Sequence, residues 1–585
     1  MYLEKINSPD DLKQFNMEEC VELAKEIRVH LLEAVSKKGG HLSSNLGIVE
    51  LTIAMHYVFQ SPKDKMIFDT SHQCYVHKML TGRKKAYMDI EYYGENTGYT
   101  NPKESIHDLF EFGHTSTSIS LACGIAKARD LRGDKENVIA VIGDGSLGGG
   151  EALEGLNYGG SDLKSNLIII FNDNQMSIAE NHGGIYTGLK QLRESKGRTA
   201  NNIFKFLGYE YYFVEDGHNI AQLVELLKKV KDCTKPTVIH ICTKKGKGYT
   251  NAEKDQENTH FVKSFNIEKG DFCKPVLGER YDIIVRDYLL KKMKKDSSVA
   301  FVTAAMPIVL GFNKDIRSQI GKQYIDVGIA EEHAVSMIGG MAKRGGKPVF
   351  ATRATFFQRA YDQISQELCL NKLAATLIVI NASIYATTDK THLGIYDIAM
   401  MSNIPNLVYL APTNKQEYIA MLEWSIEQNE YPVAIRAPRN GVFYAKHNVE
   451  QNYSRLNRFQ IESEGEKIAV IALGDFFQLG EKVVEKVEEK LHISATLINP
   501  RYITGIDEEM LEKLTYNHQI IITLEDGILD GGFGQKIASF YGKKDIKVIN
   551  YGFKKEFFDN FDVETFLEKN RLNPDQIVED IEKLI

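Results

Sequence analysis

The chain has 585 residues, 43% of them apolar and 26% charged, with a formal net charge of −8. This length exceeds what one hydrophobic core supports, so the sequence predicts several globular domains of ordinary composition. The acidic balance, the lack of a Lys/Arg block and the lack of 18 uninterrupted apolar residues argue against nucleic acid and membrane as partners.

The first predicted domain covers residues 1–270, where apolar runs of strand length alternate with helical patterns. We expect one helix over residues 9–36, a second that contains Glu50 and Met55, and a third from Ser118 to about Arg132. We expect strands over residues 66–69, 138–142, 167–171 and 237–242. Residues 179–202 are polar, contain four glycines and predict a surface loop.

Two further α/β domains are predicted over residues 277–446 and 458–585, separated by linkers over residues 268–275 and 445–457. The second domain begins with a helix over residues 281–295, and its strands are expected over residues 299–302, 324–327, 348–352, 375–380 and 407–410. Strands of the third are expected over residues 468–473, 495–498, 519–523 and 546–549. The predicted fold class is therefore α/β, with three domains that each contain a mainly parallel sheet flanked by helices.

Polar clusters follow two neighbouring strands of the first domain. Gly143-Asp144-Gly145-Ser146 follows one strand, and Asn172-Asp173-Asn174 follows the next. Two parallel strands joined by a crossover end at the same sheet edge, where α/β proteins bind ligands. Asp144 and Asn174 can then supply oxygen ligands to Mg²⁺, while the glycines admit backbone N–H groups to a diphosphate. An Asp-Gly turn with an unrelated Asn-rich loop is the alternative.

Glu331 is the first candidate for proton chemistry, because it follows a predicted strand and opens a helix. A buried carboxyl group there could exchange a proton with a ring nitrogen of a ligand, although an acid that merely stabilises the helix dipole is the alternative. Five histidines lie in loops or at element ends and together favour a proton-handling pocket: His41, His72, His114, His260 and His392. His56 and His333 lie in helical patterns and are interpreted as structural. No histidine spacing suggests zinc.

These residues resemble a known family. Gly-Asp-Gly followed about thirty residues later by Asn-Asp-Asn is a thiamine diphosphate and Mg²⁺ motif shared by many enzymes. Two segments are more specific, Gly113-His114-x-Ser116-Thr117-Ser118 and Gln358-Arg359-Ala360-Tyr361-Asp362-Gln363. With them, essentially the whole chain is similar to the 1-deoxy-D-xylulose-5-phosphate synthase family of transketolase-like enzymes.

The resemblance implies thiamine diphosphate and Mg²⁺ as cofactors, pyruvate and glyceraldehyde 3-phosphate as substrates, and a homodimer. It implies that Mg²⁺ is held by Asp144, Asn174 and the carbonyl of Met176. The implied cofactor contacts are His72, His114, Ser116, Gly145, Ser146, Asn174, Ile178, Tyr249, Glu331 and Phe356. The implied catalytic residues are Glu331, at the aminopyrimidine ring, and the substrate-facing His41, His114, His260 and His392.

The sequence departs from the family pattern where the acceptor phosphate is expected. Asn381 stands in place of an arginine, and Thr388 in place of an aspartate. The phosphate would then rely on Arg359 and Arg439, which keep family positions, and on Arg353 or Lys390. The segment after Tyr186 is also shortened, which leaves the closure of the site open.

Two alternatives to the implied activity therefore stay open. One is a related carboligase or transketolase with another aldehyde acceptor or a ketose donor, and the other is a catalytically silent cofactor-binding subunit. The seven cysteines include no Cys-x-x-Cys pair, and the amino terminus carries no signal-like segment, which favours a cytoplasmic protein. By resemblance, its product would enter isoprenoid, thiamine and pyridoxal synthesis.

Overall fold

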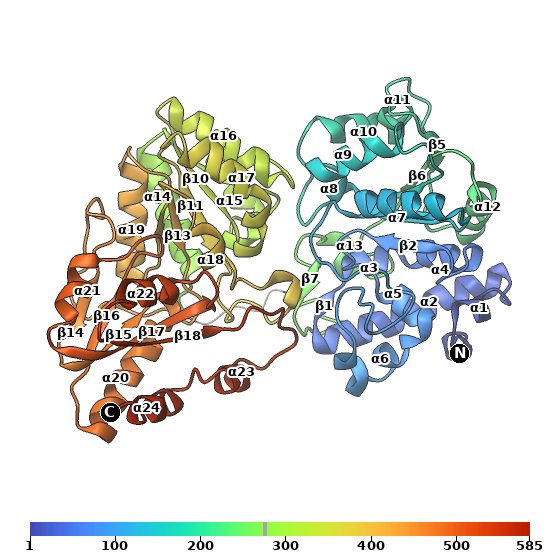
Figure 1. Cartoon of the computed structure of the whole chain (residues 1–585). Coiled ribbons are helices and arrows are strands. Elements are labelled where there is room, and N and C mark those ends of the chain that lie inside the picture. The colour runs from blue at the N-terminus through green and yellow to red at the C-terminus, as the bar shows by residue number, and fades with distance from the viewer. Residues whose placement is uncertain (273–277) are drawn as a thin grey trace. The chain divides into compact units, whose positions relative to one another are not determined.

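The structure is a computed structural model that describes residues 1–272 and 278–585 (Figure 1). The chain divides into two compact units, Met1–Val276 with Gly328–Ala330 and Leu277–Val327 with Glu331–Ile585. The end of the first predicted linker and the first residue of the second predicted domain lie outside the described residues. The exact ranges of the three domains stay a prediction.

The first unit is built on a five-stranded parallel sheet in the order β2-β3-β4-β6-β5. Its strands are β2 (Lys65–Phe68), β3 (Val138–Gly143), β4 (Ile168–Asp173), β5 (Glu210–Val214) and β6 (Thr237–Cys242). Its longer helices are α2 (Met17–Lys38), α4 (Val49–Val58), α7 (Ser118–Arg132), α9 (Gly150–Gly159), α10 (Gly184–Glu194) and α12 (Ile220–Val230).

Helices cover both faces of this sheet (Figure 1). Successive strand residues point to opposite faces, so Ala140 packs in the core with α7 and α9 while Val141 packs in the core with α2, α4 and α12. Both faces of β3 are therefore apolar, as the uninterrupted apolar run over residues 138–142 predicts. The carboxyl end of the sheet is left as the place for polar side chains.

The predicted single helix over residues 9–36 is wrong, because the structure contains two helices there. α1 (Pro9–Leu12) ends before Asn16, and α2 begins at Met17. The Asn16 side chain accepts the backbone N–H of Glu19, and the Glu19 side chain accepts the N–H of Asn16, both at 2.9 Å. This capping box satisfies the first donors of α2 and fixes its start.

The predicted surface loop over residues 179–202 is also wrong in part, because it contains the helix α10. Leu189 and Leu192 on this helix are buried against the same core as α7 and α9. Their packing outweighs the cost of Gly188 within the helix, which a reading of glycine content alone does not anticipate.

The second unit contains two sheets. A six-stranded parallel sheet has the order β12-β13-β11-β10-β8-β9, and a five-stranded sheet has the order β14-β16-β15-β17-β18 with only β14 antiparallel. The strands of the first are β8 (Val299–Thr303), β9 (Tyr324–Asp326), β10 (Lys347–Arg353), β11 (Thr376–Ile380), β12 (Val408–Leu410) and β13 (Val433–Arg436). Those of the second are β14 (Gln460–Ser463), β15 (Lys467–Ala472), β16 (Thr496–Asn499), β17 (His518–Ile528) and β18 (Lys547–Phe553).

These two sheets share one hydrophobic core. Val302 and Leu377 of the six-stranded sheet belong to the same buried cluster as Ala469 and Ile521 of the five-stranded sheet. The longer helices around the sheets are α14 (Tyr281–Lys295), α16 (Glu331–Lys343), α19 (Lys415–Glu427), α20 (Phe477–Leu491), α22 (Phe533–Tyr541) and α24 (Pro574–Glu582). The prediction of three mainly parallel sheets flanked by helices is confirmed, whereas strands β5, β13 and β14 of these sheets were not predicted. The small sheet of β1 (Gly40–His41) and β7 (Phe261–Val262) was not predicted either.

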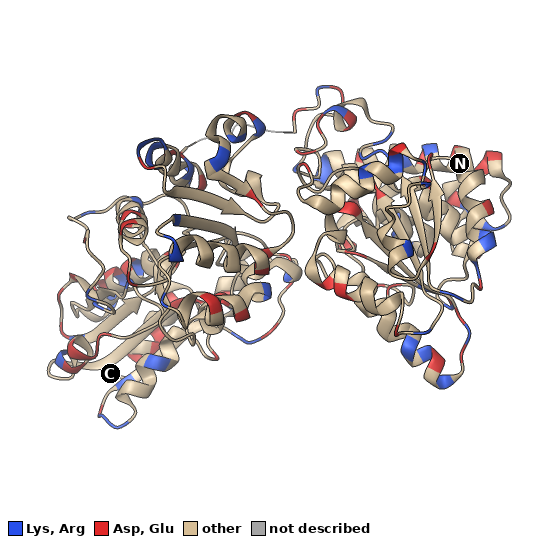
Figure 2. Cartoon of the chain, turned by 90° about the horizontal axis from the view of Figure 1, so that it is seen from above, with Lys and Arg blue, Asp and Glu red and all other residues tan. Residues whose placement is uncertain are grey.

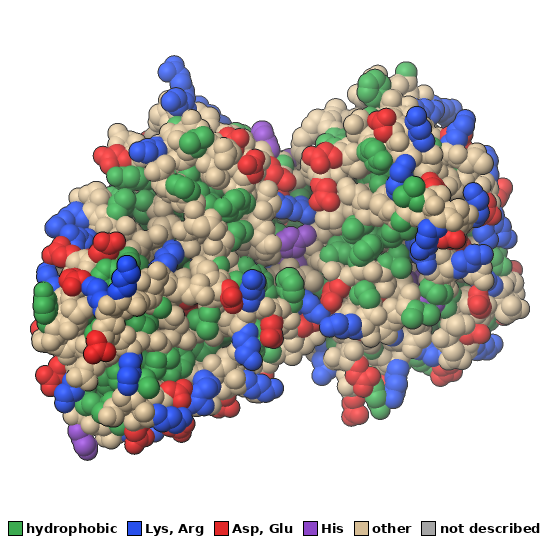
Figure 3. Space-filling view, viewed as in Figure 1, with side chains coloured by type: hydrophobic (Ala, Val, Ile, Leu, Met, Phe, Trp, Pro, Cys, Tyr) green, Lys and Arg blue, Asp and Glu red, His purple; other side chains and the backbone are tan. Residues whose placement is uncertain are grey.

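Charged side chains of both signs are interleaved along the helices of both units (Figure 2). On the face that Figure 3 shows, hydrophobic, basic and acidic side chains are intermixed rather than gathered into one broad patch. Within the two described ranges, no helix combines the length and the apolar character needed to cross a bilayer.

Candidate active site

Asp144 lies at the carboxyl end of the first sheet. β3 and β4 pair in parallel with Gly143 opposite Asn172, so the two predicted polar clusters leave the same sheet edge. Asp144 is buried, and its Oδ2 accepts a hydrogen bond from the Asn181 side chain at 2.6 Å. Its Oδ1 has no hydrogen-bond partner among the described residues. A buried carboxylate oxygen in this state fits a cation that would compensate its charge.

The charge around Asp144 supports that fit. Burial and the neighbouring charge of Asp173 raise the pKa of Asp144 to about 7. Asp173 itself is satisfied, because Arg193 and His240 donate to its Oδ2 at 2.6 and 2.9 Å. Burial alone would raise the pKa of Asp173, but the hydrogen bond from His240 and the charge of Arg193 lower it overall. Of the two acids, Asp144 is therefore the one with an uncompensated oxygen.

The loop that carries Asp144 touches the turn after β4. A Cβ atom added to Gly145 would lie 2.9 Å from the Cβ and Oγ atoms of Ser177, so only glycine permits this approach. In the same turn, the Asn174 side chain accepts the backbone N–H of Met176 at 3.2 Å. The buried Lys245 donates to the carbonyl of Ser177 at 2.5 Å. The structure thus brings the Gly-Asp-Gly and Asn-Asp-Asn motifs together, with Ile178 half-buried beside Ser177.

Ser116 and Ser146 are also neighbours. The Ser116 side chain donates to the carbonyl of Ser146 at 2.8 Å, and the Ser116 backbone adopts a left-handed conformation with φ of +73°. The carboxylate of Asp69, directly after β2, accepts the N–H groups of Ser116 and Ser118 at 2.8 and 3.0 Å. Asp69 therefore fixes the turn that opens α7, with His114 half-buried two residues earlier.

Three of the predicted histidines form a cluster. The strand β1 (Gly40–His41) pairs with β7 (Phe261–Val262) and brings His41 next to His260, with ring centroids 5.6 Å apart. His72 lies 5.0 Å from His41 and 5.2 Å from His260 by the same measure. The buried Asn45 side chain donates to the carbonyls of His41 and His72, each at 2.9 Å, and so holds the two segments together.

Tyr249 has a different environment within the same unit. Its ring packs against Phe265 and Phe272, and its hydroxyl group donates to the carbonyl of Ile267 at 2.6 Å. It begins α13 (Thr250–Lys254) as the N-cap residue. A place for Tyr249 beside the cofactor stays a prediction.

Glu331 is the candidate for proton exchange in the second unit. It opens α16, is buried, and its Oε2 atom has no hydrogen-bond partner in the part of the chain that the structure describes. Burial raises the pKa of Glu331 to about 7, although the charge of Arg359 opposes the rise. A carboxyl group that ionises near neutral pH can both accept and donate a proton, which is the property expected of a group that exchanges a proton with a bound ring.

Phe356 and His392 are neighbours in the second unit, with ring centroids 5.7 Å apart in an edge-to-face arrangement. His392 is also held by Thr391, whose hydroxyl group lies 2.8 Å from the His392 Nδ1 atom. The predicted ring contact and the predicted catalytic histidine of this unit therefore lie side by side.

The three arginines predicted to grip phosphate have distinct surroundings. Arg353 ends β10 and is paired in register with Ile380 of β11, directly before Asn381. Arg359 is close enough to Glu331 to lower its pKa, whereas the Arg439 backbone donates to Asp475. Lys390 forms an ion pair of 3.5 Å with Asp559. Of these residues, Arg353 has its backbone beside the strand end that leads into Asn381.

Asn45, Asp69 and Lys245 were not predicted as site residues. Each is buried and donates to, or accepts from, backbone groups of a predicted site segment. Their sequence signals are weak, because an asparagine in a helix, an aspartate after a strand and a lysine before a glycine have many ordinary uses. Across the described ranges, no cluster of three or more His, Cys, Asp or Glu side chains could hold a metal ion. The site at Asp144 would use one carboxylate with neutral oxygens.

Matches to models of known protein families give the class of this protein first. Residues 282–443 match the model of the pyrimidine-binding domain of transketolase, and residues 457–577 match that of the transketolase C-terminal domain. The chain is a transketolase-like α/β protein. Residues 3–200 and 194–243 match the family model described as 1-deoxy-D-xylulose-5-phosphate synthase.

Relatives extend this match over the full chain. Proteins named 1-deoxy-D-xylulose-5-phosphate synthase from Caldanaerobacter subterraneus and Alkaliphilus oremlandii are 39% and 38% identical, covering 99% and 100% of this chain and 98% and 99% of their own. The chain belongs to the 1-deoxy-D-xylulose-5-phosphate synthase family. A solved transketolase from Campylobacter jejuni aligns at 16% identity with a TM-score of 0.44, over 97% of this chain and 100% of that one, a likeness too low to add to the argument.

Proposed function

We propose that the protein is a 1-deoxy-D-xylulose-5-phosphate synthase, which decarboxylates pyruvate and joins the two-carbon unit to glyceraldehyde 3-phosphate with release of CO₂. The observation that carries the proposal is a pair of buried acids, Asp144 and Glu331, each with an unpartnered oxygen among the described residues, in a chain of this family. When bound, thiamine diphosphate supplies a nucleophilic carbon for cleavage of the 2-oxo acid and transfer to the aldehyde.

The first unit would hold the diphosphate end of the cofactor. Asp144, Asn174 and the carbonyl of Met176 would bind Mg²⁺, and Ser116, Gly145 and Ser146 would face the phosphates. The support is the contact of Gly145 with Ser177 and the hydrogen bond from Ser116 to Ser146, which join the three segments. Asp69 and Lys245 would keep these backbones in place.

Glu331 would exchange a proton with the aminopyrimidine ring, and Phe356 would stack on that ring. A carboxyl group with a pKa near 7 is matched to proton exchange at neutral pH. His41, His114, His260 and His392 would bind and protonate the oxygens of the substrates, and His72 would contact the cofactor. The clustering of His41, His72 and His260 supports a shared role for these three.

The acceptor phosphate would be bound by Arg353, Arg359 and Arg439. The register of Arg353 beside the Ile380–Asn381 strand end supports its role as a substitute. The absence of an arginine at position 381 keeps one alternative worth testing, namely the same carbon transfer to an aldehyde without a phosphate. We further propose a cytoplasmic homodimer whose product feeds isoprenoid and thiamine synthesis.

The test is an assay of purified protein with Mg²⁺, thiamine diphosphate and pyruvate, in which CO₂ release and the sugar product are followed across a panel of aldehydes. We expect 1-deoxy-D-xylulose 5-phosphate with glyceraldehyde 3-phosphate and slower turnover with unphosphorylated glyceraldehyde. Preferential turnover of another aldehyde would replace the proposed acceptor. No CO₂ release with any aldehyde, in protein that binds the cofactor, would favour the silent subunit.

A further inference from the structure

Residues 96–112 form an irregular segment that runs from the end of the helical turn Ile90–Glu95 to the turn with His114 and Ser116. No helix or strand occurs between residues 96 and 117. An unstructured stretch of this length inside a compact unit is uncommon and tends to be functional. Something other than a sheet or helix must therefore satisfy its backbone and fix its path.

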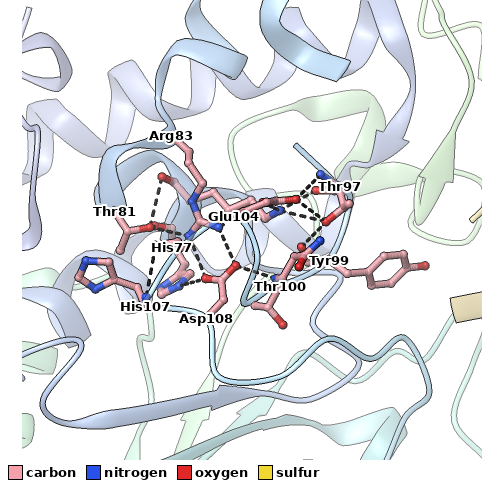
Figure 4. A network of polar contacts seen from close by, with 12 residues as sticks. His77, Thr81, Arg83, Thr97, Tyr99, Thr100, Glu104, His107 and Asp108 are labelled. Carbon is pink, nitrogen blue, oxygen red and sulfur yellow. Dashed lines mark hydrogen bonds and ion pairs between the residues drawn. The ribbon is translucent and has the colours of Figure 1, made fainter. Parts of the chain in front are cut away.

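Asp108 is the centre of the contacts that hold this segment (Figure 4). Its carboxylate receives two hydrogen bonds from Arg83, at 2.6 and 2.8 Å, and one from the His77 ring at 2.9 Å. It also accepts the backbone N–H of Asn101 at 2.7 Å, which closes the segment on itself. Asp108 and His77 are buried, so these bonds are shielded from water.

Glu104 is a second anchor. Its carboxylate accepts the N–H of Thr97 at 2.7 Å and a hydrogen bond from the fully buried Lys78 at 2.6 Å. Lys78 also donates to the carbonyl of Thr97 at 2.8 Å, and Arg83 reaches Glu104 at 3.3 Å. Glu104 and Asp108 thus pair with Lys78 and Arg83 of the preceding helical region.

The formal charges of this network balance only when its histidines are neutral. Asp108 and Glu104 match Arg83 and Lys78 one for one, and burial lowers the pKa of both His77 and His56. His77 donates to Asp108 through Nε2, so its Nδ1 accepts from the Nε2 of His56 at 2.9 Å. His107 lies nearby, with its Nδ1 atom 2.8 Å from the Ser61 hydroxyl group. The network is a fixed structural unit rather than a set of surface ion pairs.

The network of Asp108 and Glu104 fixes the position of Tyr99. The Tyr99 backbone lies within the network, while Figure 4 shows its ring pointing away from the charged groups. Tyr99 is 8% exposed, and its ring packs edge-to-face against His41, with centroids 5.6 Å apart. The neighbouring Thr100 is tied to the segment of His72, because its N–H donates to the hydroxyl group of Ser71 at 3.2 Å.

We infer that residues 96–112 form a preformed wall of the active site, held by Asp108 and Glu104, and that Tyr99 on this wall is a substrate-positioning residue. Its ring would hold His41 in orientation, and its hydroxyl group would face the oxygens of the 2-oxo acid. The inference rests on the proposed function for its substrate and on the geometry for the wall. Asp108, Arg83 and His77 act through Tyr99 and are themselves positioning residues.

The experiment compares Y99F, Y99L and D108N in the holoenzyme. Y99F removes only the hydroxyl group and should raise the KM for pyruvate about two- to tenfold, the effect of one lost hydrogen bond. Y99L also removes the ring and should lower kcat/KM about tenfold or more, because His41 loses its orienting contact. Hydrogen exchange of residues 96–112 should stay slow in both variants and become fast in D108N.

R129Q is the matched control. Arg129 is a buried arginine with a similar set of polar contacts, to Asp130, Ser165 and Asn166, and it lies at the opposite, amino-terminal end of the sheet. It should destabilise the unit without a change in the KM for pyruvate or in exchange of residues 96–112. Equal effects of R129Q and D108N on both readouts would reduce the network to a general stabiliser and overturn the inference.

Failure of the proposed function has a different signature. If the wild type binds thiamine diphosphate but does not turn pyruvate over, pyruvate can be titrated calorimetrically into the same holoenzyme. Weaker pyruvate binding by Y99L would then still support Tyr99. Unchanged kcat/KM in Y99L, or unchanged pyruvate affinity where there is no turnover, would overturn its role.

Discussion

Arg353 and Ile380 are direct partners on neighbouring parallel strands, which places the Arg353 backbone beside the strand end that leads into Asn381. The resemblance implies an arginine where this chain has Asn381, and this chain carries Arg353 at the end of the neighbouring strand. We propose that the charge of Arg353 takes the place of the one at position 381. The relationship gives the acceptor-binding proposal a direct test.

R353M should weaken binding of a phosphorylated acceptor. Loss of one charge-assisted contact predicts a rise in the KM for glyceraldehyde 3-phosphate of about tenfold or more, with a much smaller change for glyceraldehyde. Steady-state kinetics with both aldehydes measures this difference. R344M, at an exposed arginine nearby in the sequence, is the control. An equal loss with both aldehydes would show that Arg353 does not contact the phosphate.

D144N should abolish Mg²⁺-dependent binding of thiamine diphosphate, because it removes the only carboxylate among the proposed ligands. Calorimetric titration of the cofactor with and without Mg²⁺ gives the affinity directly. Chelation of Mg²⁺ should lower the melting temperature of the wild-type holoenzyme and leave that of D144N unchanged. D162N, at an exposed aspartate, should behave as the wild type. Retained Mg²⁺ dependence in D144N would show that Asp144 does not bind the metal.

E331Q should lose carbon transfer yet gain stability at alkaline pH. The pKa of Glu331 is raised from 4.5 to about 7 in the folded protein, so the unfolded chain releases this proton first. Glu331 therefore lowers the stability of the wild type as pH rises from about 4.5 to 7, and the full cost of about 3 kcal/mol is present at pH 8.

The free energy of unfolding at pH 8 and at pH 4.5 measures the effect. Trp424, the only tryptophan of the chain, lies in the same unit as Glu331 and reports its unfolding by fluorescence. E331Q should be more stable than the wild type at pH 8, and the difference should shrink toward zero at pH 4.5. A constant difference at both pH values would mean that the carboxyl group is not the cause.

D69A should weaken both α7 and cofactor binding. Asp69 is buried and accepts the N–H groups of Ser116 and Ser118, so its loss should leave these donors unpaired, at a cost of about 1 to 3 kcal/mol, and release the turn of Ser116. D562A is the control, because the exposed Asp562 caps α23 (Val563–Lys569) in the other unit. A loss of stability in both variants that is larger in D69A, with lower cofactor affinity in D69A alone, is the expected result. Unchanged cofactor affinity in D69A would leave Asp69 a structural residue only.

The sequence predicts most of the central parallel strands because they are buried on both faces and form continuous apolar runs. The strands that escaped prediction are at sheet edges, such as β5 and β14, whose side chains are largely half-buried or exposed, or are short, such as the buried four-residue strand β13. α10 escaped because packing of Leu189 and Leu192 outweighs its glycines. Tertiary burial decides such cases, and a local pattern does not contain it.

Some residues of the candidate site could be predicted from the sequence and others could not. Asp144 and Glu331 could be predicted because a motif or a strand end marks them. Asn45 and Lys245 could not, because they bind backbone carbonyls 27 and 68 residues distant in sequence. A carbonyl is the same for every residue type, so such a partner leaves no trace in the sequence. The residues that position the site are therefore visible only in the folded protein.

The common core of the two sheets in the second unit has a consequence for how the chain can be divided. Truncation after residue 457 would remove Ala469 and Ile521 from the shared core and leave the apolar side chains that pack against the five-stranded sheet facing water. Exposed apolar surface of that kind drives aggregation. A fragment with the six-stranded sheet alone should therefore be insoluble, although its strands form a complete sheet. The carboxyl-terminal sheet therefore keeps the apolar surface of the preceding sheet out of water.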